Sequence, residues 1–174
     1  MRAIYRMLKR REYTARDGSR KIAHNLEMTV PDVGTGDLYI SADVYNSIRD
    51  LALIDGDEVG LTFGLDVFRG EVSPRLVAVN GDAVSAGGVI AIYRMLKRRE
   101  YTARDGSRKI AHNLEMTVPD VGTGDLYISA DVYNSIRDLA LIDGDEVGLT
   151  FGLDVFRGEV SPRLVAVTPA VMAA

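Results

Sequence analysis

Residues 16–30, RDGSRKIAHNLEMTV, join a turn signal to an alternating strand. Asp17-Gly18 is a dipeptide that favours a tight hairpin, because a type I′ turn needs positive φ at both central positions. From residue 21 onward, one set of side chains recurs at every second position and is mostly apolar: Ile22, His24, Leu26, Met28 and Val30. This is the period of a strand with one buried face. The stretch therefore predicts a hairpin whose second strand contributes to a core.

The flanking segments extend this pattern into one small unit. The first strand, 4–14, carries charge on both faces in its distal half, which predicts a hairpin wing that projects from the body. A helix is expected after Ser41, which is a suitable N-cap, with an apolar face at Val44, Ile48 and Leu51. The expected order is β-β-β-α-β-β, with strands at 4–14, 21–30, 38–40, 58–63 and 67–79.

The whole unit occurs twice without a substitution. Ala3–Val79 reappears as Ala91–Val167, a copy of 77 residues shifted by 88 positions. Natural repeats keep a pattern rather than an identity, so the copy favours a recent duplication or a deliberately fused single-chain dimer. The predicted organisation is a first repeat at 1–79, a flexible linker at 80–90, an identical second repeat at 91–167 and a tail at 168–174. A unit this small gains stability from a partner, so we expect the two repeats to pair.

Composition is that of a soluble globular protein, with 47% hydrophobic and 26% charged residues. No apolar run approaches the length needed to span a bilayer, and the first residues lack the apolar segment of a secretory signal. Cysteine is absent, which excludes disulfides, a thiol nucleophile and a cysteine zinc site. We expect no membrane partner and a cytoplasmic setting.

Charge is unevenly distributed within each repeat. Residues 3–31 hold seven basic and three acidic side chains, whereas residues 32–79 hold three basic and nine acidic ones. Such asymmetry indicates a basic surface offered to a polyanion, although a solvated hairpin would also explain it.

Single-stranded nucleic acid is bound by cations that contact phosphates and by aromatic rings that stack on bases. The basic hairpin supplies both groups, and Tyr39 at the start of the third strand is a further stacking candidate. The candidate binding residues are Arg6, Lys9, Arg10, Arg11, Tyr13, Arg16, Arg20, Lys21 and Tyr39, with Arg94, Lys97, Arg98, Arg99, Tyr101, Arg104, Arg108, Lys109 and Tyr127 in the second repeat.

The sequence contains few candidate catalytic residues. His24 and its copy His112 lie on the presumed inner face, where a buried structural imidazole is expected. Phe63 is expected in the core, and Phe68 is expected to anchor a loop. We predict no enzyme, no catalytic residues, no metal site and no cofactor.

Five strands with one helix between the third and fourth is the arrangement of an OB-fold barrel. The basic turn at 16–23, the segment 51–61 and the closing strand 70–79 resemble those of OB-fold single-stranded DNA-binding proteins. The small dimeric binding proteins of filamentous phages have a similar size and share the basic hairpin. The resemblance implies a mainly β fold, two copies of a five-stranded OB-like barrel with one helix each. It also implies a single-stranded nucleic-acid partner, DNA in preference to RNA.

Two alternatives remain open. Residues 40–59 also resemble the strand-helix-strand segment of swapped-hairpin transcription regulators of the AbrB kind, which bind duplex DNA as dimers. The third possibility is a structural or assembly protein whose basic hairpin contacts an acidic partner.

Overall fold

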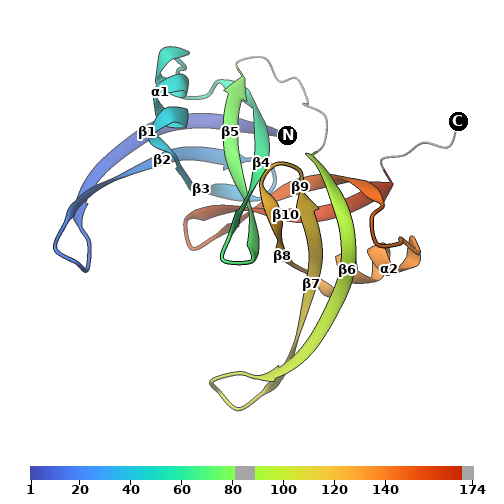
Figure 1. Ribbon diagram of the computed structural model, residues 1–174. Helices are drawn as coiled ribbons and strands as arrows, with labels where there is room; N and C mark the ends of the chain where they lie inside the picture. Colours follow the sequence, from blue (N-terminus) through green and yellow to red (C-terminus); the bar gives the residue numbers. More distant parts are fainter. Residues whose placement is uncertain (81–88, 170–174) are drawn as a thin grey trace, which may run out of the picture. The chain divides into compact units, whose positions relative to one another are not determined.

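The structure, a computed structural model, describes residues 1–80 and 89–169 and confirms a mainly β protein (Figure 1). In each copy three strands precede a helix and two strands follow it. The first copy contains β1 (Arg2–Thr14), β2 (Arg20–Val30), β3 (Gly34–Ile40), α1 (Ala42–Asp50), β4 (Glu58–Phe68) and β5 (Glu71–Asn80). The second contains β6 (Val89–Thr102), β7 (Arg108–Val118), β8 (Gly122–Ile128), α2 (Ala130–Asp138), β9 (Glu146–Phe156) and β10 (Glu159–Pro169).

The described residues divide into two compact units, each of which draws on both copies. Unit 1 holds residues 1–64, 75–80 and 152–162, and unit 2 holds residues 65–74, 89–151 and 163–169. Each unit thus contains most of one copy together with the tip of a hairpin from the other.

Most of the predicted linker and tail, residues 81–88 and 170–174, lies outside the described residues. At the edges of these segments, Asn80 ends β5 and Val89 begins β6. Thr168 and Pro169 end β10.

In unit 1 the hydrogen-bonded strand order is β4-β1-β2-β3-β10. β1 and β2 are antiparallel from Ile4 opposite Thr29 to Thr14 opposite Arg20, whereas the pairing of β2 with β3 ends at His24 opposite Ile40. The β1–β2 hairpin therefore continues beyond β3 (Figure 1). We call residues 10–23 the arm; residues 98–111 are the arm of unit 2.

The turn at the arm tip differs from the prediction. Only Gly18 has positive φ there (86°), so the predicted type I′ turn is wrong. A longer loop closes the hairpin, in which the Ala15 N–H donates to Ser19 O (2.8 Å) and the Gly18 N–H donates to Ala15 O (3.0 Å). Asp17 instead stabilises the loop by accepting from the N–H and hydroxyl of Ser19 at 2.9 and 2.6 Å. The two consecutive positive φ values occur at Arg69 (51°) and Gly70 (78°), at the tip of β4–β5.

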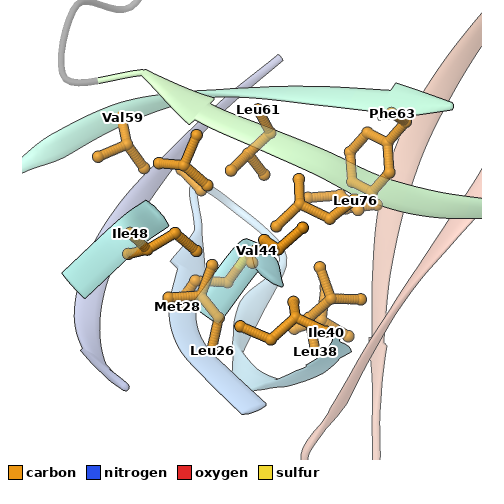
Figure 2. Packing of buried hydrophobic residues seen from close by; sticks show 14 of the residues in the cluster. Leu26, Met28, Leu38, Ile40, Val44, Ile48, Val59, Leu61, Phe63 and Leu76 are labelled. Atoms are coloured by element: carbon orange, nitrogen blue, oxygen red, sulfur yellow. The ribbon is translucent and has the colours of Figure 1, made fainter. Parts of the chain in front are cut away.

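The core of unit 1 lies between the inner face of β1–β3, the helix and β4–β5 (Figure 2). Leu26 and Met28 are almost completely buried, as the alternation predicts. Leu153 and Val160, from the hairpin of the second copy, belong to the same cluster. Full burial of such a side chain contributes about 1.5–3 kcal/mol to the free energy of folding. The hairpin tip of the second copy therefore adds to the stability of unit 1.

Helix α1 begins as the sequence predicts. Ser41 is the N-cap and its hydroxyl accepts from the Val44 N–H at 3.2 Å. Val44 and Ile48 are buried, but Leu51 is the C-cap and is exposed, because the helix ends before its side chain can turn inward. Neither helix among residues 1–80 and 89–169 is long and apolar enough to cross a membrane.

The hairpin tip of β9–β10 is seated on β3. Glu159 pairs with Asp37 in parallel, and the Asp37 N–H donates to Gly158 O at 2.8 Å. The two backbones come so close that a Cβ on Gly36 would lie 2.7 Å from Gly158 O. Only glycine fits at position 36 without moving the hairpin. Unit 2 has the same contact between Gly124 and Gly70.

Candidate nucleic-acid interface

Three neighbouring strands of unit 1 present one continuous outer face. On the side of the sheet away from the buried Leu26 and Met28, the register places Tyr13 beside Lys21 and Asn25 beside Tyr39. Side chains alternate between the two faces of a strand, so Arg11, two residues from Tyr13, lies on this face as well. We call this side of the three strands the outer face; its residues include Arg11, Tyr13, Lys21, Asn25 and Tyr39, with Arg99, Tyr101, Lys109, Asn113 and Tyr127 in unit 2.

The cations of the arm are largely free of counter-charges. Within the described part of the chain, these four form no ion pair: Arg10, Arg11, Arg16 and Lys21. Arg20 approaches Glu12 at 3.6 Å, but both side chains are strongly exposed, so the pair is weak. Arg10 lies opposite His24 and therefore projects from the inner side of the arm. The arm thus offers positive charge on both of its faces.

Two tyrosines stand exposed on the outer face. Tyr39 is 70% exposed and Tyr13 is 42% exposed, and the corresponding residues of unit 2, Tyr127 and Tyr101, have the same values. Exposed rings on a strand are available for stacking on bases.

Arg6 is held within the body of the unit. Its Nε donates to Thr29 Oγ1 at 2.9 Å, and its terminal nitrogen donates to Asp55 at 3.1 Å. Arg94 makes the same contacts with Thr117 and Asp143. These two predicted binding residues therefore lie apart from the arm, and their role in binding stays a prediction.

Lys9 lies on the outer face between two carboxylates. Its Nζ is 2.8 Å from Glu27 Oε1 and 3.0 Å from Asp37 Oδ1. The pKa of Lys9 is raised by its hydrogen bonds to Glu27 and then to Asp37. Because the pKa is raised on folding, the protonated Lys9 stabilises the folded protein. This stabilisation is complete below pH 10.5, the ordinary pKa, and is lost at higher pH. We call Lys9, Glu27 and Asp37 the lysine triad; Lys97, Glu115 and Asp125 repeat it.

Two exposed residues at each exchanged hairpin tip, a phenylalanine and an arginine, are not among the binding residues predicted from the sequence. Phe68 and Phe156 are 68% and 69% exposed, so the prediction that Phe68 anchors a loop is wrong. The guanidinium carbon of Arg157 lies 5.1 Å from the centre of the Phe156 ring, a cation–π contact. Since Gly158 rests against Asp37 on β3, this aromatic–cation pair lies next to the edge of β3 in unit 1. The dipeptide Arg69-Gly70, which suits a tight turn, was the available signal in the sequence.

His24 is half-buried rather than fully buried. Its ring centre lies 4.8 Å from that of Tyr45, and the two planes are tilted by 55°. Phe63 is buried in the core, as expected. The imidazole is thus a packing element at the edge of the core.

Comparison with known proteins gives structural likeness alone. No protein-family profile matches the chain, and no curated protein matches it. The wild-type single-stranded DNA-binding protein from Thermus aquaticus is similar with 12% identity and a TM-score of 0.42, over 99% of this chain and 92% of that one. A deletion mutant of that protein is similar with 14% identity and a TM-score of 0.35, over 97% of this chain and 82% of that one. Both of these structures belong to a single-stranded DNA-binding protein.

Proposed function

We propose that the protein binds single-stranded DNA through the outer face and the arm of each unit, and that it is not an enzyme. The observation that carries this proposal is the shared face, on which Arg11, Tyr13 and Lys21 lie in line with Tyr39. Cationic side chains bind phosphates, and exposed aromatic rings stack on unpaired bases. A duplex keeps its base faces stacked on one another, so this combination favours a single strand.

We also propose that each unit is an OB-like barrel. Support comes from the parallel contact between the third strand and the fifth strand of the other copy, Asp37 with Glu159. OB folds bind oligonucleotides on the face of their second and third strands and with the loops that join strands 1–2 and 4–5. In unit 1 the arm is the first of these loops, and the tip at Phe156 and Arg157 is the second.

The tandem itself belongs to the same proposal. Two identical 77-residue repeats, fused into one chain, exchange hairpin tips and form two binding sites. A fusion of this kind removes dissociation on dilution, because the second repeat stays at a high effective concentration. The proposed setting is the cytoplasm.

Titration of labelled oligonucleotides tests the proposed function. We expect a DNA strand of about 16 nucleotides to bind more tightly than the corresponding RNA or duplex. Binding should weaken steeply between about 50 and 200 mM salt, because phosphate contacts release counterions. Preferred binding of a duplex, above all of a palindrome, would instead indicate a transcription regulator. No binding to any strand at low salt would favour an assembly protein.

The exchanged tips predict which substitutions act on the same site. Tyr39→Ala with Phe156→Ala removes two rings from unit 1, whereas Tyr39→Ala with Phe68→Ala removes one ring from each unit. With a strand short enough to fill one site, the first pair should leave one site of normal affinity. The second pair should leave two equally weakened sites, since each stacked base contributes about 1–3 kcal/mol.

Isothermal titration with a short oligothymidylate separates these outcomes through stoichiometry. The two double variants are matched, because each removes one tyrosine and one phenylalanine. If Tyr39→Ala with Phe68→Ala retained one normal site, each tip would serve its own copy and the composite site would be wrong.

A further inference from the structure

Like charges lie directly opposite one another on the outer face. Glu27 on β2 pairs across the strands with Asp37 on β3, an arrangement that is unfavourable by itself. Lys9 reaches across β2 and contacts both carboxylates at 2.8 and 3.0 Å. The side chains are 36%, 28% and 34% exposed for Lys9, Glu27 and Asp37, so water reaches the group only in part. Nearly the same distances, 2.8 and 3.1 Å, recur around Lys97.

The lysine triad lies in the path that a bound strand would follow. Asn25 and Tyr39 are two residues from Glu27 and Asp37 on the same face, and the arm continues beyond them. On the other side, the Asp37 N–H contacts Gly158 at the exchanged tip. A strand that contacts the arm, Tyr39 and Phe156 therefore passes close to a group whose net charge is −1.

We propose that Glu27 and Asp37 hold the Lys9 ammonium away from phosphates, so that the lysine triad lowers the affinity for nucleic acid. Lys9 is already neutralised, and binding a phosphate would leave both carboxylates unpaired beside a polyanion. Arg11 and Lys21 form no such pairs among the described residues and bind phosphate at no comparable cost. The triad thus limits tight binding at the centre of the site. This inference rests on the proposed function.

Neutral isosteres of the carboxylates test the inference. The variant carries Glu27→Gln, Asp37→Asn, Glu115→Gln and Asp125→Asn, and it is compared with wild-type protein by titration of labelled oligothymidylate over a salt series. We expect at least about tenfold tighter binding near physiological salt. The salt dependence of each site, as the slope of log K against log salt, should steepen by about 0.7, because one lysine in each unit gains a phosphate contact.

A second variant reports on the lysine itself. Lys9→Met with Lys97→Met should leave the slope unchanged, because these ammonium groups release no counterions in the wild-type protein. Arg11→Met with Arg99→Met should reduce the slope of each site by about 0.7. An equal reduction in the lysine and arginine variants, or no gain in affinity from the isosteres, would overturn the inference.

The isostere variant also raises the net charge, which needs a matched control. Asp32→Asn and Asp50→Asn, with Asp120→Asn and Asp138→Asn, remove as many carboxylates from exposed positions off the outer face. A gain in this control equal to that of the isosteres would assign the effect to overall charge and overturn the inference. If the arginine variant loses no affinity or the wild-type protein binds no strand, the proposed function fails. If only the lysine and isostere results depart from expectation, the inference alone fails.

Discussion

Replacing both Gly36 and Gly124 with alanine should lower the free energy of unfolding by about 3 kcal/mol for each unit. A Cβ on Gly36 would lie 2.7 Å from Gly158 O and 2.9 Å from Gly158 C, which are backbone atoms that cannot rotate away. Relief of the clash moves the hairpin and breaks the hydrogen bond from the Asp37 N–H to Gly158 O. Thermal unfolding followed by circular dichroism should show a melting temperature lower by more than about 10 °C.

The control is Gly18→Ala with Gly106→Ala, at the arm tips. There a Cβ meets nothing within 4 Å, but φ is 86°, so only local backbone strain is expected. That strain costs about 1 kcal/mol. Equal melting of the two variants would show that the hairpin is not seated against Gly36.

Local signals account for the part of the fold that the sequence predicts. The alternation from Ile22 to Val30 predicts β2 and its buried face, and Ser41 with Val44 predicts the start and orientation of the helix. Each of these features depends on neighbours within a few residues. Leu51 shows where prediction from local spacing fails. The helix ends at this residue, so the helical period no longer determines which way its side chain faces, and it is exposed.

The exchange of hairpin tips could not be predicted from the sequence. The two copies are identical, so no residue indicates which copy places its tip on β3. The turn at Arg69-Gly70 was missed because the predicted strands, 58–63 and 67–79, place the break between them at 64–66, whereas β4 continues to Phe68. The exposure of Phe68 depends on tertiary structure, and the spacing of apolar residues in the sequence does not reveal it.

For the site, composition identified the basic hairpin but could not assign counter-charges. Arg6 pairs with Asp55, which is 49 residues away, and Lys9 pairs with Asp37, 28 residues away. These distances in sequence are closed only by strand register, and the bulge between Tyr5 and Met7 changes that register. Among the described residues, Arg10, Arg11, Arg16 and Lys21 form no such pairs, because β3 and its carboxylates end before the arm begins.

Removing two arginines and the tyrosine of each arm should weaken DNA binding by at least about 100-fold. Two phosphate contacts and one stacked base are lost in each unit, and a stacked base alone contributes about 1–3 kcal/mol. All the altered side chains are exposed, so the melting temperature should stay close to that of the wild-type protein. The variant carries Arg10→Ala, Arg11→Ala and Tyr13→Ala together with Arg98→Ala, Arg99→Ala and Tyr101→Ala.

A conservative counterpart, with lysine for these arginines and phenylalanine for these tyrosines, keeps the charge and the rings. It should bind almost as tightly as the wild-type protein, since phosphate binding needs the charge and stacking needs the ring. Tight binding by this variant together with weak binding by the alanine variant would separate the chemistry of the arm from its shape.

The salt dependence of oligothymidylate binding by the alanine variant is the most direct measurement of the role of the arm. Two lost phosphate contacts at each site should make the slope of log K against log salt shallower by about 1.4, with the affinity falling at every salt concentration. An unchanged slope and an unchanged affinity would contradict binding through the arm and its outer face.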